Sequence, residues 1–182
     1  PIEKKPLFHF LPGTKTYSIA AEGCNFRCGN CQNWRISQTM KNPEILEISG
    51  EKITPSQVVK AAQKTKCPSI SFTYTEPTIF SEFALDTMKI AKNKGLKNVF
   101  VSNGFMSKES AKMIIPYLDA NNIDIKSFSD EFYRKNCGGR LAPVLETCKL
   151  MKKSGVWVEI TTLAIPGLSD SKENFSAIAK FI

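Results

Sequence analysis

The sequence is poor in histidine and has no long apolar run. His9 is the only histidine among 182 residues, and no apolar stretch reaches the roughly 18–20 residues that a membrane-spanning helix needs. The scarcity of histidine leaves few ligands for a Cys/His zinc site. The lack of an apolar run gives no reason to expect a membrane partner. Internal repeats and low-complexity segments, which would indicate a solenoid or a linker, are also missing.

The composition is that of an ordinary globular domain. Hydrophobic residues make up 42% of the chain and charged residues 23%, and the length suits one domain with a substantial core. The formal net charge of +8 permits an anionic partner. The lysines, however, are scattered over positions where helical surfaces are expected, so solvated faces explain them better than a nucleic-acid surface.

The two ends of the sequence suggest a segment of a longer chain. It begins at Pro1 without a methionine and stops at Ile182 inside a helical pattern. We therefore expect residues 1–182 to form a single core domain taken from a longer protein. Residues 1–16 read as an irregular N-terminal segment.

Strand-like and helix-like runs alternate along the chain. Five short apolar runs predict strands, at residues 17–21, 69–74, 98–102, 122–126 and 156–163. Helical periodicity follows at residues 54–62, 80–91, 108–118 and 141–153, and again after a cap at Asp170 or Ser171. Residues 35–53 read as a long irregular connection. This alternation predicts an α/β fold with a parallel sheet of right-handed strand–helix–strand units, open or partly closed.

Three cysteines fall within a single run, Cys24-Asn25-Phe26-Arg27-Cys28-Gly29-Asn30-Cys31, which directly follows the first expected strand. Three closely spaced thiolates can hold three corners of a [4Fe–4S] cluster and leave the fourth iron open to a ligand. A structural zinc site would need a fourth ligand and is commonly built from two spaced pairs. The spacing therefore favours an iron–sulfur cluster with one open iron.

The other three cysteines show no pairing pattern with this run or with each other. Cys148 continues a helical apolar stripe, which indicates a buried small hydrophobe. Cys137 lies in Asn136-Cys137-Gly138-Gly139; a functional thiol there stays open, but the pattern gives it no support. A disulfide scaffold does not suit a chain of this length, so we expect a reducing, intracellular setting.

Polar residues follow every expected strand. After the cysteine run come Tyr74-Thr75-Glu76-Pro77, Ser102-Asn103-Gly104, Asp124-Ile125-Lys126-Ser127 and Thr161-Thr162. Each has a structural explanation when taken alone: a helix entry, a turn, an ion pair. Together they predict a ligand site, because ligands of parallel β/α folds bind at the carboxyl ends of the strands.

These motifs resemble those of the radical S-adenosylmethionine (SAM) superfamily. The Cys-x3-Cys-x2-Cys run matches the signature of that superfamily, and Tyr74-Thr75-Glu76 occupies the place of its Gly-Gly-Glu motif. The Asp124-Ile125-Lys126 run is similar to the Asp-x-Lys strand of glycyl-radical activating enzymes such as the pyruvate formate-lyase activating enzyme. Cys31-Gln32-Asn33-Trp34, residues 122–128 and residues 165–170 resemble the AmmeMemoRadiSam system radical SAM enzymes more closely still.

The resemblance implies a parallel (β/α) partial barrel of five to six strands, with helices outside and one side open. The last strand would lie beyond Ile182. It also implies two cofactors, a [4Fe–4S] cluster and SAM, with Cys24, Cys28 and Cys31 as the metal ligands. The implied SAM contacts are Thr75, Glu76, Ser102, Asn103, Asp124, Lys126 and Thr162, with Glu76 at the amino group. The implied cluster environment comprises Phe26, Asn30 and Asn33.

The implied activity is reductive cleavage of SAM to a 5′-deoxyadenosyl radical that abstracts a hydrogen atom. A cytoplasmic enzyme with a flavodoxin- or ferredoxin-type electron donor is expected. The sequence leaves open which substrate loses the hydrogen atom. The likeness to activating enzymes suggests a partner protein, and the alternatives are a peptide, a small molecule or a modified RNA base. The alternative is a non-catalytic iron–sulfur or zinc-binding module that docks nucleic acid.

Overall fold

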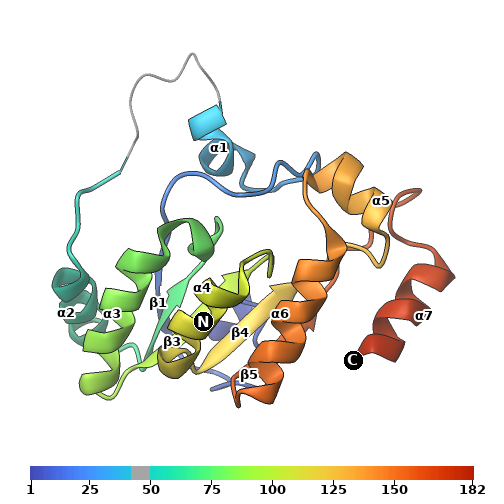
Figure 1. Ribbon diagram of the computed structural model, residues 1–182. Helices are drawn as coiled ribbons and strands as arrows, with labels where there is room; N and C mark the ends of the chain where they lie inside the picture. The colour runs from blue at the N-terminus through green and yellow to red at the C-terminus, as the bar shows by residue number, and fades with distance from the viewer. Residues whose placement is uncertain (42–49) are drawn as a thin grey trace.

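The fold is described from a computed structural model, in which residues 1–41 and 50–182 are described. Its centre is one five-stranded sheet (Figure 1). The strands are β1 (Thr16–Ile19), β2 (Ser69–Phe72), β3 (Lys97–Ser102), β4 (Ala120–Asp124) and β5 (Trp157–Thr161). Neighbours in the order β1-β2-β3-β4-β5 pair in parallel. Among the described residues β1 and β5 do not pair with each other, so the sheet is the open partial barrel that the sequence predicted.

Helices connect the strands and cover one face of the sheet (Figure 1). The longer ones are α2 (Pro55–Lys64), α3 (Ser81–Asn93), α4 (Lys108–Ile114), α6 (Leu141–Lys153) and α7 (Lys172–Phe181). Their starts follow from local capping. The Thr54 side chain accepts the Gln57 amide while the Gln57 side chain accepts the Thr54 amide, which completes a capping box. The sequence offered Asp170 or Ser171 as the N-cap of α7, and the structure shows that it is Ser171.

The main apolar core lies between the sheet and these helices. Ile70, Phe72, Phe100 and Ile123 are fully buried there, and the rings of Phe72 and Phe100 lie 5.4 Å apart. These residues alternate along their strands with residues of the other face, as the pleat of a strand requires. The helices contribute a buried apolar stripe each, for example Val144 and its neighbours on α6.

The N-terminal segment covers part of the opposite face. Ile2 and Leu7 are fully buried and form a second apolar cluster with Val99 of β3 and Ala120 of β4. Residues 1–16 are mostly irregular, as expected, apart from the 3₁₀ turn η1 (Ile2–Lys4) and the start of β1. The segment thus belongs to the core and is not a loose arm.

Three further segments correct or extend the sequence-based expectation. The connection at 35–53 was predicted to be irregular, but it opens with helical turns, α1 (Trp34–Ser37) and η2 (Thr39–Lys41); residues 42–49 lie outside the described part. Short turns η3 (Pro77–Phe80) and η4 (Ile115–Tyr117) flank α3 and α4. An unpredicted pair, α5 (Asp130–Phe132) and the π-helical η5 (Tyr133–Cys137), follows β4. Helices this short carry too little periodicity to be recognised.

Membrane spanning finds no support in the fold. Within residues 1–41 and 50–182, no helix combines the length and the apolar character needed to cross a bilayer.

The Glu159 carboxylate fastens the N-terminal segment to β5. It accepts the backbone N–H groups of Phe8 (2.8 Å), His9 (3.1 Å) and Phe10 (3.2 Å) and the indole N–H of Trp157 (3.0 Å). Its side chain is 13% exposed. Burial opposes ionisation, but these hydrogen bonds outweigh it and lower the pKa of Glu159 below the usual 4.5. The carboxylate is therefore an anchor that works in its charged form.

We predict that Glu159→Gln weakens this anchor. An amide offers one neutral acceptor where the carboxylate offers two charged oxygens, so we expect the free energy of unfolding to fall by about 1 kcal/mol. Because the folded pKa is depressed, the carboxylate's contribution is present above the usual pKa and is lost as the pH falls through the folded value. Urea titrations at several pH values measure this: the gap between wild type and variant should be constant at neutral pH and shrink in acid.

Glu146→Gln, on the exposed surface of α6, is the matched control and should leave stability unchanged. A gap that stays constant down to strongly acidic pH would contradict the assigned role of the Glu159 charge.

Candidate functional site

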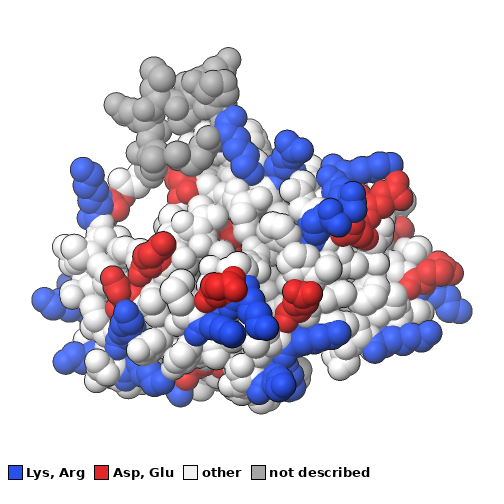
Figure 2. Space-filling model, in the orientation of Figure 1, with Lys and Arg blue, Asp and Glu red and all other residues white. Residues whose placement is uncertain are grey.

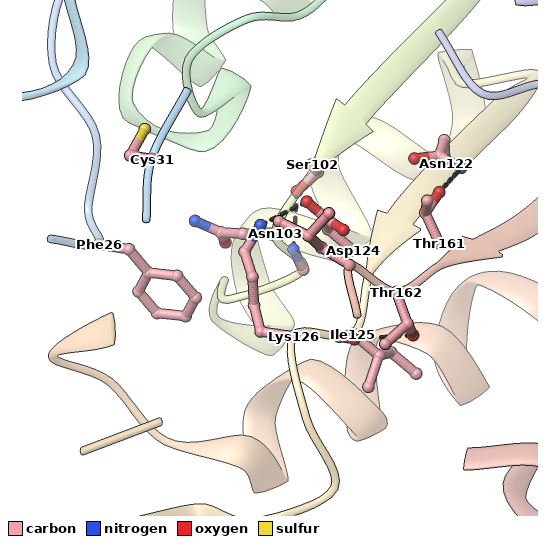
Figure 3. A network of polar contacts seen from close by, with 12 residues as sticks. Phe26, Cys31, Ser102, Asn103, Asn122, Asp124, Ile125, Lys126, Thr161 and Thr162 are labelled. Atoms are coloured by element: carbon pink, nitrogen blue, oxygen red, sulfur yellow. Dashed lines mark hydrogen bonds and ion pairs between the residues drawn. The ribbon is translucent and has the colours of Figure 1, made fainter. Parts of the chain in front are cut away.

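The carboxyl ends of the strands bring the predicted site residues to one edge of the sheet. The cysteine loop leaves β1 there, and the loops after β2, β3, β4 and β5 meet it. Figure 3 shows Asn103, Asp124, Lys126 and Thr162 at the strand ends, with Phe26 and Cys31 of the cysteine loop across from them. The parallel register produces this meeting, since every strand ends on the same side.

The three cysteine thiols of the loop each contact a different partner. Cys24 Sγ lies 3.8 Å from Asn103 Nδ2, and Cys31 Sγ lies 3.3 Å from Ser37 Oγ. Cys28 shares a hydrogen bond with the thiol of Cys137. In the described part of the chain no three His, Cys, Asp or Glu side chains are grouped closely enough to hold one metal ion. The thiols must turn away from these partners to share a cluster.

Two of these thiols differ in acidity. The hydrogen bond from Cys137, opposed by burial and helped by the positive charge of Lys126, lowers the pKa of Cys28 to about 7. Burial raises the pKa of Cys24 to about 11. The metal ligand is the thiolate, so Cys28 is the readier of the two to lose its proton.

The Glu76 carboxylate joins the ends of β2 and β3. Oε1 accepts from Thr78 Oγ1 (2.6 Å), the Thr78 backbone N–H (3.1 Å) and Ser102 Oγ (2.8 Å). Oε2 accepts the backbone N–H of Asn103 at 2.8 Å. Glu76 is only 1% exposed, and this burial raises its pKa although the hydrogen bonds oppose the shift. Three of the four donors thus face Oε1, and one faces Oε2.

Asn103 links the end of β3 to the cysteine loop. Its Nδ2 donates to Asn25 Oδ1 at 2.8 Å, and Asn25 Nδ2 donates to the Phe105 carbonyl at 2.7 Å. The Phe105 amide returns to Asn103 Oδ1 at 2.8 Å. Together with the contact to Cys24 Sγ, this closed set of hydrogen bonds holds the first cysteine against the strand end.

Asp124 and Lys126 form an ion pair at the end of β4. Burial disfavours the ammonium, but the adjacent Asp124 carboxylate more than offsets this, and the pKa of Lys126 is raised. Thr162 Oγ1 donates to the Ile125 carbonyl at 2.9 Å, which ties the end of β5 to the same loop. Across the site, Thr75 Oγ1 donates to the carbonyl of Ala21 at 2.6 Å.

Phe26 anchors the cysteine loop in the core. It is 1% exposed, and its ring centroid lies 5.0 Å from that of Phe105 and 5.9 Å from that of Tyr133. Its carbonyl accepts from Gln38 Nε2 (3.2 Å) and Lys41 Nζ (2.6 Å). The middle of the loop is therefore fixed by packing on one side and by η2 and its neighbour on the other.

Tyr74, the first residue of the Tyr74-Thr75-Glu76 run, contacts Lys5, which the sequence analysis did not single out. Tyr74 has φ +69°, the left-handed region that glycine favours, and it stands at the first position of the expected Gly-Gly-Glu motif. Asn33 Nδ2 donates to its carbonyl at 2.8 Å, and Lys5 Nζ lies 3.8 Å from the centroid of its ring. Lys5 is 3% exposed. Asn30, half-buried, directly precedes Cys31 on the loop.

Residues 18–182 match the Radical SAM superfamily, and the chain belongs to that family. Family membership supports SAM and a [4Fe–4S] cluster as the cofactors, as the sequence predicted. It also accounts for the open parallel barrel.

Individual proteins and one solved structure show which members of the family the chain is similar to. The chain is 50% identical over its whole length to an uncharacterized protein of Methanocaldococcus jannaschii, and it spans 53% of that protein. It is 26% identical over 178 residues to the pyruvate formate-lyase-activating enzyme of Clostridium pasteurianum, covering 94% of this chain and 70% of the enzyme. The fold resembles that of TsrM, a radical SAM methyltransferase of Kitasatospora setae solved with cobalamin and a [4Fe–4S] cluster. That TM-score is 0.63 at 12% identity, over 92% of this chain and 35% of TsrM.

We predict that Glu76→Gln destabilises the site edge. The amide nitrogen must face one of the groups that now donate to the carboxylate, which leaves a buried donor without an acceptor. The expected loss in free energy of unfolding is about 2–3 kcal/mol, measured by urea denaturation at neutral pH. Glu82→Gln, on the exposed side of α3, should cost much less. Equal losses in the two variants would show that the buried carboxylate does not hold the strand ends together.

Proposed function

We propose that this chain is the catalytic core of a radical SAM enzyme, with a [4Fe–4S] cluster on Cys24, Cys28 and Cys31. The proposal is carried by one observation: a family-matching loop with three thiols lies at the carboxyl edge of the sheet, beside the polar ends of four other strands. When bound, the cluster would supply the electron that cleaves SAM to methionine and a 5′-deoxyadenosyl radical.

The donor set fits such a cluster in its chemistry. Three thiols on one loop suit three irons, and the ligands of a [4Fe–4S] cluster are thiolates. All three cysteines are partly accessible and none is in a disulfide. Lys126 adds positive charge near Cys28, which favours an anionic centre there.

The strand ends would hold SAM through the residues that the family resemblance implies. Ser102, Asn103 and Thr75 offer polar groups, and the ion pair of Lys126 and Asp124 can exchange partners to meet a carboxylate or a hydroxyl. Thr162 completes the set at the end of β5. These side chains come from the ends of four strands, β2, β3, β4 and β5, so a ligand there would bridge four neighbouring strand ends.

Glu76 has a more demanding part in this proposal. The resemblance assigns it to the amino group of SAM, but its two oxygens already accept four hydrogen bonds. Oε1 accepts three of these bonds and Oε2 only one, so Oε2 is the oxygen that could meet an ammonium. Its other task is to hold Ser102 and Asn103 in place, which makes it a positioning residue for the neighbours that face the site.

The proposed substrate is a partner protein from which the radical abstracts a hydrogen atom. Support comes from the relatives named as activating enzymes, those of pyruvate formate-lyase and of 4-hydroxyphenylacetate decarboxylase. A flavodoxin- or ferredoxin-type protein would supply the electron, in the reducing cytoplasm that an oxygen-sensitive cluster needs.

A nucleic-acid docking role has no comparable support. On the face shown in Figure 2, basic side chains alternate with acidic ones and do not gather into one patch, whereas a nucleic-acid surface needs a continuous basic stripe.

We predict that the anaerobically reconstituted, dithionite-reduced protein shows the electron paramagnetic resonance signal of a [4Fe–4S] cluster, and that added SAM shifts it. A shift is expected because SAM would bind the iron that has no protein ligand. Cys28→Ala should lose both the signal and the cleavage of SAM, since two thiols cannot hold three irons.

Cys67→Ala is the matched control, because Cys67 is buried in the turn between α2 and β2, outside the cysteine loop. It should keep the signal. A cluster that ignores SAM, or zinc in place of iron, would contradict the proposed function; a cluster retained by Cys28→Ala would refute the ligand assignment.

A further inference from the structure

The cysteine loop is held against η5 on both sides of Cys28. The Arg27 N–H donates to the Cys137 carbonyl at 2.8 Å, and the Gly29 N–H donates to the Asn136 carbonyl at 3.0 Å. These two backbone bonds flank Cys28 and fix its position relative to Cys137. The side chains of Cys28 and Cys137 hydrogen-bond to each other through their sulfurs.

The turn after Cys137 is shaped for this close approach. A Cβ atom on Gly139 would lie 2.3 Å from Phe26 Cε1, so only glycine fits there. Gly138 has φ +72°, and a Cβ on it would meet the Arg27 side chain at 2.8 Å. The two glycines let η5 pack directly on the residues that precede Cys28.

The other loop thiols are directed elsewhere. Cys31 would be the nearest partner of Cys28 along the chain, in a Cys-x-x-Cys arrangement, but its sulfur contacts Ser37 Oγ at 3.3 Å. Cys24 lies beside Asn103. Cys137 is fully buried and Cys28 is partly exposed, so a reagent from solvent reaches Cys28 first.

We propose that Cys28 and Cys137 form a reversible disulfide in the protein without its cluster, and that this bond withholds Cys28 from iron. The pair is a modification site formed by one loop cysteine and one cysteine of η5. Its effect on the cluster rests on the proposed function; the disulfide itself does not.

A small-molecule disulfide such as oxidised glutathione is the oxidant. The Cys28 sulfur attacks it, forms a mixed disulfide and releases one glutathione thiol; the Cys137 sulfur then attacks the Cys28 sulfur and releases the second. Each protein thiol passes its proton to a departing glutathione. In sum, two protein thiols are oxidised to one disulfide and one oxidised glutathione is reduced to two thiols.

Peptide mapping tests the bond directly. The full chain, freed of metal by a chelator, is treated anaerobically with oxidised glutathione, alkylated and digested with trypsin. Cleavage after Arg27, Arg35, Lys135 and Arg140 places Cys28 and Cys31 in peptide 28–35, Cys24 in the preceding peptide and Cys137 in peptide 136–140. We expect 136–140 linked to 28–35 and released by dithiothreitol, with fragmentation that assigns the bond to Cys28.

A disulfide inside peptide 28–35, a link to the peptide that holds Cys24, or complete alkylation of Cys137 would each overturn the proposal. Cys31→Ser is the companion variant: it removes the competing thiol of peptide 28–35 and should leave the link to 136–140 intact.

Iron uptake tests the consequence. Oxidised wild type should bind several-fold less iron on reconstitution without a thiol reductant than after dithiothreitol. In Cys137→Ser the reaction stops at the mixed disulfide on Cys28, so this variant should gain the mass of one glutathione, which the wild type should not retain. Cys148→Ser, a buried cysteine of α6, should behave as wild type. Equal iron uptake by the oxidised and the reduced wild type would refute the withholding of Cys28.

The two proposals fail separately. Should no cluster form even in the reduced wild type, the proposed function falls while the mapped disulfide stands. Should Cys137→Ser not fold, as judged by far-ultraviolet circular dichroism, the mapping on wild type and on Cys31→Ser decides the matter.

Discussion

Parallel pairing of consecutive strands is the constraint on which this site depends. A parallel strand must be followed by a return across the sheet, and here the returns run through helices on one face (Figure 1). Every loop that leaves a carboxyl end therefore opens on the same edge. The register places Ser102 beside Ile123, the residue before Asp124, and Asp124 beside Thr161. Polar groups from distant parts of the sequence therefore meet at this edge because the strands are paired.

Buried polar groups then lock this edge. The Glu76 carboxylate bridges β2 and β3, and the Asn103 amide bridges β3 and the cysteine loop. Breaking one of these hydrogen bonds would leave a buried polar group unpaired, which costs more free energy than the bond itself contributes. These bridges therefore hold the strand ends in fixed positions. On the other face the N-terminal segment packs on β3 and β4 and is fastened to β5 by Glu159. The segment also reaches the loop after β2, where the Lys5 ammonium lies over the ring of Tyr74.

The cysteine loop lies between competing partners. Its thiols contact Asn103, Cys137 and Ser37, whereas a shared cluster would draw them together. Phe26 holds the middle of the loop in the core. A change from the present thiol partners to a shared cluster therefore involves the cysteine side chains and not the loop as a whole. Cys28 is the residue for which this competition matters most, because the same sulfur that would bind iron interacts with the thiol of Cys137.

The sequence by itself determined the elements and the chemistry of the loop. Periods of two and of 3.6, a capping box at Thr54 and the spacing of Cys24, Cys28 and Cys31 are local patterns, so the five strands, the longer helices and the donor set could be predicted from them. The tertiary structure alone decided which groups meet. Cys137 beside Cys28, Lys5 under Tyr74 and Glu159 on the amides of residues 8–10 join segments far apart in the chain, and no local period encodes such contacts. They arise only when the sheet, its helices and the N-terminal segment have packed, because packing fixes which loops share an edge.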